Sequence, residues 1–188
     1  MSYRPITDIW FLARAKLKGG EKFYGAYLGG FPERARALLG VTINDPVLHV
    51  CGGKSRLYPY KGGFGPNDKT LDMDLDVKPD YLYDAREQFP LNEDGPEEIE
   101  GPIQWPAILI DPPYSEADAA HYAPGVAAYP KPNLLMKNAM AAVRPGGRVG
   151  ILHYMLPQVK DAKFIAAVGV LCGFNNRIRI YSVFERPI

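Results

Sequence analysis

The sequence predicts an α/β fold, with a doubly wound, mostly parallel sheet that is followed by a C-terminal antiparallel β-hairpin. Short apolar segments of strand length alternate along the chain with helical or loop segments, and 19 Gly and 18 Pro residues separate them. Near the C-terminus, two β-rich segments flank residues 172–176, a Cys-Gly-Phe-Asn-Asn stretch whose residue types tolerate positive φ. The chain has 188 residues, which is enough for one domain to bury a core.

The N-terminal 45 residues are expected to form an extension of a core that occupies residues 46–188, within one domain over 1–188. One short helix is predicted in this extension over residues 32–40, which place Pro in the first turn, Glu beside it and Gly at the end. An apolar patch at residues 9–13 is too short for a signal peptide or a membrane span. We therefore expect a soluble, intracellular protein of the cytoplasm that does not associate with membranes.

The core is expected to contain five strands ahead of the hairpin, each an apolar or β-rich run bounded by Gly, Pro or Asp. They are predicted over residues 46–51, 69–74, 79–84, 107–110 and 148–154. A helix is predicted over residues 132–143, because apolar residues recur on one side and Arg-Pro-Gly-Gly follows. The hairpin strands are predicted over residues 163–171 and 177–184, with a helix over 162–171 as the alternative for the first.

Charge, cysteine and histidine content narrow the classes of function. The 22 Lys and Arg residues oppose 21 Asp and Glu, so no global positive field attracts a polyanion, and nucleic-acid contact needs a local basic patch or a helper protein. Cys51 and Cys172 lie far apart without metal-ligand spacing, which predicts neither a disulfide framework nor a zinc site. His49, His121 and His153 show no spacing typical of a metal site or a triad, so we expect no metal and a core or surface role for each.

The predicted strands end on residue types that bind ligands. In chain order these ends carry Gly52-Gly53, then Asp72 or Asp74, then Asp84, and finally Asp111-Pro112-Pro113-Tyr114. In doubly wound sheets, ligands bind beyond the carboxyl ends of the strands, near the point where strand order reverses. One edge of the sheet is therefore expected to gather all four groups. Gly52-Gly53-Lys54-Ser55 also copies the end of a phosphate-binding loop, but the apolar strand directly before it leaves no loop to enclose a phosphate.

The Asp111-Pro112-Pro113-Tyr114 stretch resembles the catalytic motif of amino-group methyltransferases, typified by DNA adenine methylases, in which Asp, Asn or Ser precedes Pro-Pro and an aromatic residue. Val50-Cys51-Gly52-Gly53 keeps the glycine turn of that family's cofactor loop but not its usual spacing, and residues 143–154 resemble its helix, Pro-Gly-Gly, strand segment. The resemblance extends from about residue 46 to the end of the chain. It implies a Rossmann-like class I methyltransferase fold, S-adenosyl-L-methionine as the cofactor, and a nucleobase amino group as the methyl acceptor.

The resemblance also implies a role for each residue of the motif and of the strand ends. The implied catalytic residues are Asp111, Pro112, Pro113 and Tyr114; the implied cofactor-binding residues are Tyr24, Cys51, Gly52, Gly53, Asp72, Asp84, Ala85 and Asp111; the implied substrate-binding residues are Tyr114 and Tyr122. Asp72, with Asp74 as the alternative, would hold the cofactor ribose hydroxyls, and Asp84 would meet the adenine amino group of the cofactor.

The chemistry of a nucleobase amine explains an acid followed by Pro-Pro. Such an amine is a poor nucleophile because its lone pair is delocalised into the ring, so two acceptors must hold its hydrogens: the Asp111 side chain and a backbone carbonyl that proline keeps stiff. Tyr114 is expected to offer a flat face to a base that has left its stack. Tyr129 is expected either to close over the substrate or to pack within its loop, and Arg177 and Arg179 are predicted on a solvated strand face.

The preferred substrate is N6 of adenine in DNA, on the strength of the resemblance. The alternatives are an RNA base amino methyltransferase, acting on adenine N6 or guanine N2, and a non-catalytic partner subunit that binds S-adenosylmethionine. Only 17 residues separate Tyr114 from the helix predicted to begin at Pro132, which is short for a target-recognition segment. A partner protein or a homo-oligomer is therefore expected to supply target recognition.

Overall fold

The computed structural model describes residues 3–15, 27–57, 63–93, 102–122, 129–173 and 177–188. Within these ranges lie eight strands: β1 (Ile6–Leu12), β2 (Val47–Val50), β3 (Lys69–Asp72), β4 (Tyr81–Leu82), β5 (Trp105–Ile110), β6 (Val143–His153), β7 (Lys163–Cys172) and β8 (Ile178–Glu185). The same ranges contain the helices α1 (Phe31–Leu39), α2 (Glu116–Tyr122) and α3 (Pro132–Ala142), and two single-turn 3-10 helices, Ser55–Leu57 and Leu75–Val77.

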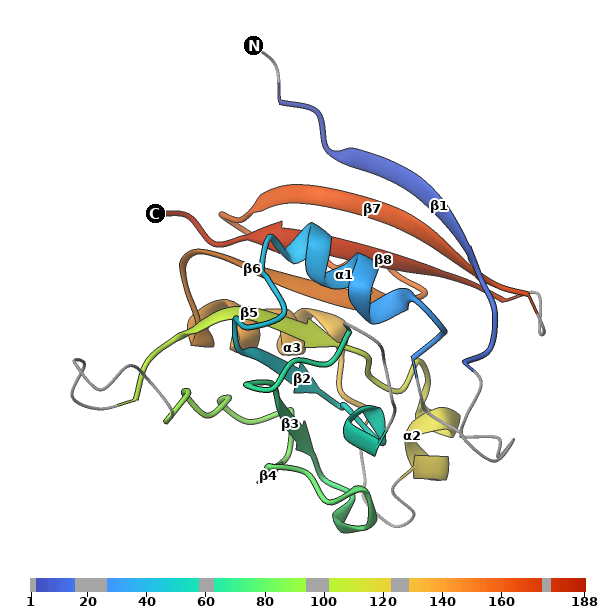
Figure 1. The fold of residues 1–188 in the computed structure, drawn as a ribbon, viewed down its shortest axis with the longest axis vertical. Helices are drawn as coiled ribbons and strands as arrows, with labels where there is room; N and C mark the ends of the chain where they lie inside the picture. Colours follow the sequence, from blue (N-terminus) through green and yellow to red (C-terminus); the bar gives the residue numbers. More distant parts are fainter. Residues whose placement is uncertain (1–2, 16–26, 58–62, 94–101, 123–128, 174–176) are drawn as a thin grey trace.

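All eight described strands form one sheet, in the order β1-β7-β8-β6-β5-β2-β3-β4 (Figure 1). The strands from β4 to β6 in this order pair in parallel, and β8 is antiparallel to both β6 and β7. From β2 the chain adds β3 and β4 on one side and then returns to place β5 on the other, so strand order reverses between β2 and β5. The predicted doubly wound, mostly parallel sheet with a C-terminal hairpin is confirmed, and the alternative helix over residues 162–171 is wrong.

The predicted core strands all occur, and two of them differ in length from the prediction by more than two residues. The strand predicted over residues 79–84 is reduced to β4, Tyr81–Leu82. The strand predicted over 148–154 begins earlier, at Val143, because the chain pairs with β5 on both sides of a bulge. Between two successive pairs, Trp105 with Val143 and Ala107 with Arg148, β6 advances by five residues while β5 advances by two.

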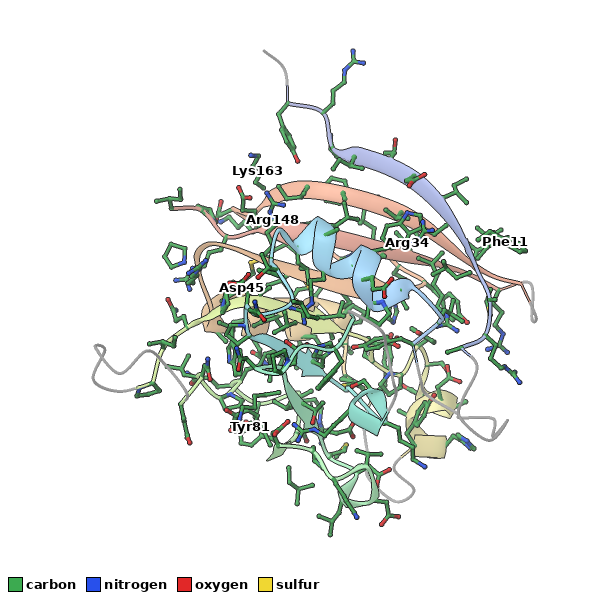
Figure 2. All side chains as sticks on the ribbon, viewed as in Figure 1. Phe11, Arg34, Asp45, Tyr81, Arg148 and Lys163 are labelled. Carbon is green, nitrogen blue, oxygen red and sulfur yellow. The ribbon has the colours of Figure 1, made fainter. Side chains whose placement is uncertain are left out.

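Strand β1 was not predicted, and it turns the apolar patch near the N-terminus into one edge of the sheet. It pairs in parallel with β7 along its whole length. Trp10 and Leu12 pack into the core, whereas Ile9 and Phe11 are 71% and 74% exposed (Figure 2 labels Phe11). The β-branched and aromatic residues of this segment are the available sequence signal for a strand. None of the helices in the described ranges combines the length and the apolarity that crossing a membrane requires.

The core occupies both faces of the sheet, with α1 on one face and α3 on the other (Figure 1). Under α1, the rings of Phe31 and Tyr181 meet edge to face at 5.1 Å, and the Tyr181 hydroxyl donates to the Ala35 carbonyl. A Cβ at Gly150 would lie 2.2 Å from that hydroxyl, so only glycine fits there. Arg148 (labelled in Figure 2) donates to the Leu38 carbonyl and to Glu185, which ties the end of α1 to β6 and β8.

A buried polar cluster fixes the start of β2 beneath α1. The Asp68 carboxylate accepts hydrogen bonds from Arg36, from Nε2 of His49 and from the backbone N–H of Val47. Because a carboxylate only accepts, Nε2 of His49 carries a proton, and Nδ1 of the same ring makes a hydrogen bond with the Tyr27 hydroxyl at 3.2 Å. His49 therefore lies in the core, which is one of the two placements predicted for it. The cluster anchors the strand whose carboxyl end leads into the candidate site.

Candidate functional site

The predicted strand-end groups meet at one edge of the sheet, around Cys51. Val50 and Ile110 are paired neighbours, and the N–H of Asp111 donates to the Val50 carbonyl at 3.2 Å. Burial raises the pKa of the Cys51 thiol well above its ordinary value, and the negative charges of Asp72, Asp111 and Asp84 raise it further. Three acids from three different strand ends thus act on one thiol at the point where strand order reverses. A neutral thiol in this place is a small flanking group and not a nucleophile.

A tight turn follows β2 and sets the shape of this edge. Cys51 and Gly53 both have left-handed backbone angles, with φ of 53° and 50°. A Cβ at Gly52 would lie 3.0 Å from the His49 carbonyl oxygen and 3.2 Å from the His49 Cβ, so this turn needs the close backbone approach of glycine. The N–H of Ser55 then donates to the Gly52 carbonyl at 3.0 Å and starts a 3-10 turn. The glycine pair predicted from the sequence therefore shapes the edge.

Asp72 joins this turn to the end of β3. Its Oδ2 accepts from the N–H of Gly53 at 2.9 Å, and its Oδ1 accepts from the N–H of Asp74 at 3.1 Å. Burial raises the pKa of Asp72 above its ordinary value, against the two backbone hydrogen bonds. The side chain of Asp74 is used differently: it caps the 3-10 turn by accepting from the N–H of Asp76. Of the two acids weighed for the ribose, Asp72 is the one that the structure fixes against the glycine turn.

Asp84 and Ala85 follow β4, at the same edge. Asp84 accepts from Nε and Nη2 of Arg86 and from its backbone N–H. These bonds hold the pKa of Asp84 below its ordinary value, so the carboxylate is ionised but shared with an arginine. The side chain of Ala85 is buried in the core on the α3 face, and its carbonyl accepts from Asn138. Both oxygens of Asp84 accept from Arg86, so a ligand at this edge would share the carboxylate with that arginine.

The Asp-Pro-Pro-Tyr motif folds back on itself directly after β5. Pro112 is buried and Pro113 is half-buried, and the Tyr114 hydroxyl donates to Oδ1 of Asp111. Burial raises the pKa of Asp111, and the positive charge of Arg179 together with the Tyr114 hydrogen bond oppose that rise. The motif therefore presents a desolvated carboxylate whose first oxygen is already oriented by an internal donor.

Arg179 belongs to this site, contrary to the solvated strand face predicted for it. Nη1 of Arg179 donates to the Tyr114 hydroxyl at 2.9 Å, and its guanidinium carbon lies 4.9 Å from the centre of the Tyr114 ring. The residue stands at the start of β8, which is antiparallel to β6, so its end of the strand lies at the same edge as the carboxyl ends of β5 and β6. The alternation of arginine and isoleucine over residues 177–180 does not show at which edge of the sheet the strand begins. The prediction for Arg179 was wrong for that reason.

Aromatic and imidazole rings surround Tyr114. Tyr154 lies 4.9 Å away and His153 lies 5.7 Å away, measured between ring centres. Nδ1 of His153 accepts from the N–H of Met155, so Nε2 carries the proton and donates to the Tyr129 hydroxyl at 2.8 Å. Burial lowers the pKa of His153, which keeps the ring neutral.

The resemblance implies two further site residues, Tyr122 and Tyr24. Tyr122 ends α2, beside the motif, and is close enough to act on Tyr114: burial first, then Asp111, and finally Tyr122 raise the pKa of Tyr114. Tyr24 lies outside the described residues. Among the described His, Cys, Asp and Glu residues, no group of three is placed to hold a metal ion.

Solved structures share this fold. TrmN from Thermus thermophilus superposes with a TM-score of 0.56 at 18% identity, over 86% of this chain and 50% of that protein. A class I S-adenosylmethionine-dependent methyltransferase from Listeria monocytogenes, described as putative, superposes with a TM-score of 0.51 at 12% identity, over 85% of this chain and 59% of that protein. The chain thus spans between one half and three fifths of their lengths. No protein-family model and no curated protein matches the sequence.

The fold is that of class I S-adenosylmethionine-dependent methyltransferases, as the resemblance implied. At 18% and 12% sequence identity, the similarity to these structures shows the fold alone. The reaction therefore has to be inferred from the residues at the carboxyl edge of the sheet.

Proposed function

We propose that the chain is an S-adenosylmethionine-dependent methyltransferase that acts on the exocyclic amino group of a nucleobase, N6 of adenine in DNA. The observation that carries the proposal is the Asp111 carboxylate, which stands where strand order reverses, with Tyr114 bonded to one oxygen and two prolines fixing the chain behind it. Within the described residues, no hydrogen bond to Oδ2 of Asp111 is found beside that to Oδ1. This second oxygen is the acceptor that an amine needs.

The residues beside Asp111 fit the proposed cofactor. The turn at Gly52 and Gly53 is tight, because Gly52 packs against the preceding strand without room for a Cβ, and Gly53 adds no side chain beside the proposed ligand. Asp72, held by the N–H of Gly53, would accept from the hydroxyls of the cofactor ribose. Asp84 and the backbone of Ala85 continue the same edge toward an adenine ring. When bound there, S-adenosylmethionine supplies an electrophilic methyl group on a sulfonium sulfur.

The chain's own residues then activate the amine. Oδ2 of Asp111 and a carbonyl within Asp-Pro-Pro accept its two hydrogens, which draws the nitrogen toward a tetrahedral geometry and frees its lone pair to bond the methyl carbon. S-adenosylmethionine held by these residues would supply the methyl carbon: the new carbon–nitrogen bond would form as the carbon–sulfur bond of the donor breaks, and the bonding electrons would go to sulfur. The methylated nitrogen is briefly cationic and strongly acidic, and its extra proton passes to the Asp111 carboxylate that already holds it.

The base must be single-stranded or extruded from a duplex, because the motif is recessed at the edge of the sheet and its groups act on an exposed amine. A net charge of only +1 supplies no general attraction for DNA, which supports a partner protein or a second copy as the source of target recognition. An intracellular, cytoplasmic setting belongs to the same proposal, since the donor and the nucleic acid are both found there.

Transfer of tritiated methyl groups by the purified chain tests the proposal. The chain is incubated with S-adenosylmethionine and, separately, with single-stranded DNA, duplex DNA and RNA, and the digested nucleosides are separated. Label in N6-methyl-2′-deoxyadenosine from DNA supports the proposal, and label only in RNA assigns the alternative substrate. Binding of the cofactor without transfer to any pool would indicate a non-catalytic partner subunit. Asp111→Asn is the matched control, because it preserves size and shape while removing the charge.

A further inference from the structure

Arg179 is a cation that the fold delivers to the Asp-Pro-Pro-Tyr motif from a distant part of the chain. It lies 65 residues after Tyr114 in sequence, on the strand that runs antiparallel to its neighbours. Its register partner on β7 is Val170, and the adjacent Ile180 pairs with His153 at the end of β6. The antiparallel direction of β8 therefore places the beginning of this strand next to the ends of the parallel strands.

The direction of the hydrogen bonds between Arg179, Tyr114 and Asp111 is determined by their chemistry. A guanidinium only donates, so the Tyr114 oxygen accepts from Nη1 of Arg179. The hydroxyl proton must then point elsewhere, and it points to Oδ1 of Asp111. Burial and the neighbouring Asp111 charge raise the pKa of Tyr114 well above its ordinary value, so the phenol keeps this proton. The three side chains form one ordered chain of donors that ends on the carboxylate.

The Arg179 side chain is held in this arrangement by two contacts with the same ring. It donates to the hydroxyl and also lies over the ring face at 4.9 Å, where a cation is attracted by the π electrons. Its Nε is buried and makes no hydrogen bond with any described residue. A buried donor left without a partner costs free energy, which a purely structural arginine at a strand end would avoid by pointing into water. The placement favours a role tied to Tyr114 and Asp111.

We infer that Arg179 is a positioning residue of the methyl transfer: through the Tyr114 hydroxyl it fixes the Asp111 carboxylate, so that Oδ1 is taken and Oδ2 faces the substrate amine. The inference rests on the proposed function for the identity of that amine. Tyr114 on this view orients the acid as well as meeting the base. Arg179 also supplies a positive charge that opposes the desolvation of Asp111, so the carboxylate stays ionised when a substrate excludes water from it.

The groups that face this chain of donors come from several elements. The neighbours of Tyr114 and Arg179 are Tyr122 on α2, His153 and Tyr154 at the end of β6, and Cys172 at the end of β7. Asp111 also acts on Cys51 after β2, and Asp72 and Asp84 act on the same thiol. The thiol of Cys51 and the ring of His153 are neutral because burial disfavours their charged forms. Asp72 and Asp84 disfavour a further negative charge at this edge. Among these groups, Arg179 is the cation that acts on Asp111.

The test compares Arg179→Gln, Arg179→Lys and Tyr114→Phe with the wild type, using Arg177→Gln as the matched control from the exposed start of the same strand segment. Two quantities are measured on the full chain. The first is the pH profile of single-turnover methyl transfer. The second needs no substrate: the pKa of Asp111, from carboxyl carbon NMR of the aspartate-labelled chain, with Asp111→Asn identifying the resonance. Cofactor affinity and thermal unfolding of each variant are recorded as checks on binding and folding.

Arg179→Gln is expected to slow transfer by about 10-fold to 100-fold at neutral pH, with cofactor affinity within about threefold. Because transfer needs ionised Asp111, the acid limb of the profile moves to higher pH, and the Asp111 resonance titrates at higher pH in step with it. Arg179→Lys keeps the charge but loses the flat, forked donor, so the acid limb returns toward the wild-type position while the rate stays low. Tyr114→Phe raises the pKa of Asp111 as well, and Arg177→Gln changes neither quantity.

The outcomes separate this inference from the proposed function. An Asp111 resonance that titrates identically in the wild type, Arg179→Gln and Tyr114→Phe overturns the role of Arg179, whatever the activity. The same holds if Arg177→Gln shifts it as far as Arg179→Gln does. Should Arg179→Gln fail to fold, Arg179→Lys decides the question, since it keeps the charge and removes the forked donor: a transfer rate equal to that of the wild type would overturn the positioning role. If the wild type transfers no methyl group to any nucleic acid while the resonance shifts as expected, the coupling holds and the nucleobase function fails.

Discussion

Replacing Asp111 with Asn should slow methyl transfer and stabilise the fold at the same time. The carboxylate has two acceptor oxygens, and Tyr114 takes Oδ1, which leaves Oδ2 for the amine. Asparagine has one acceptor oxygen. The Tyr114 hydroxyl accepts from Arg179 and must donate its own proton to residue 111, so it takes that oxygen. The amide NH₂ group then faces the substrate amine, donor against donor.

The expected loss follows from that geometry. Removal of one preorganised polar partner of a reacting group typically lowers kcat by about 100-fold to 1,000-fold, or about 2.7–4 kcal/mol. An acceptor replaced by a donor should cost at least this much. Affinity for the cofactor should change little, because the residues proposed to hold the ribose and adenine belong to other strands.

The effect on stability has the opposite sign. The pKa of Asp111 is raised in the folded protein, because burial disfavours the charge, so the folded state binds the proton more tightly than the unfolded state does. Stability therefore falls as pH rises from the ordinary pKa of an aspartate, about 3.9, through the raised value. Asn carries no charge to desolvate, and the variant should unfold at a higher temperature than the wild type near neutral pH, by about 2–4 °C for each kcal/mol recovered.

Single-turnover transfer of a tritiated methyl group gives the rate, and thermal unfolding at about pH 7 and about pH 4 gives the stability difference on either side of the transition. The stability advantage of the variant should shrink at the lower pH. A rate within about threefold of the wild type would refute the role assigned to the carboxylate. A lower unfolding temperature at neutral pH would refute the assignment of Asp111 as a desolvated acid.

Three further predictions follow from other parts of the structure. Asp72→Ala removes the acceptor of the Gly53 N–H and should weaken binding of S-adenosylmethionine by about 10-fold to 100-fold in calorimetry, and an unchanged dissociation constant would transfer the ribose role to Asp74. Gly52→Ala forces a Cβ to within 3.0 Å of a backbone oxygen and should cost about 1–3 kcal/mol in urea unfolding; a loss below about 0.5 kcal/mol would mean that the turn relaxes freely. Asp68→Asn leaves the buried Arg36 without its carboxylate and should cost about 3–5 kcal/mol near neutral pH. Burial raises the pKa of Asp68, but His49 and Arg36 outweigh it and lower the pKa overall, so this stabilisation is lost as pH falls below the ordinary aspartate value of about 3.9; an equal difference at about pH 7 and about pH 2 would contradict that.

Much of the fold follows from local patterns in the chain. Continuous apolar runs such as Ala107–Ile110 lie in the buried middle of the sheet, and the helix signals at Pro32 and Pro132 place α1 and α3 within a residue of their observed bounds. The sequence analysis missed β1, whose residues were interpreted as a short apolar patch, and α2, in which no side chain is buried and no apolar periodicity occurs. In both segments the order of polar and apolar residues was compatible with more than one secondary structure.

The sequence by itself determined which residue types stand at the carboxyl ends of the strands: the glycine pair, Asp72, Asp84 and the Asp-Pro-Pro-Tyr motif. It could do so because a parallel α/β pattern brings those ends to one edge whatever the details of packing. The tertiary structure alone decided that Arg179 joins them, that Tyr114 is bonded to Asp111, and that Tyr154 and His153 enclose its ring. These contacts depend on the antiparallel direction of β8 and on its register with β6, which are set by long-range pairing and leave no trace in the spacing of the residues along the chain.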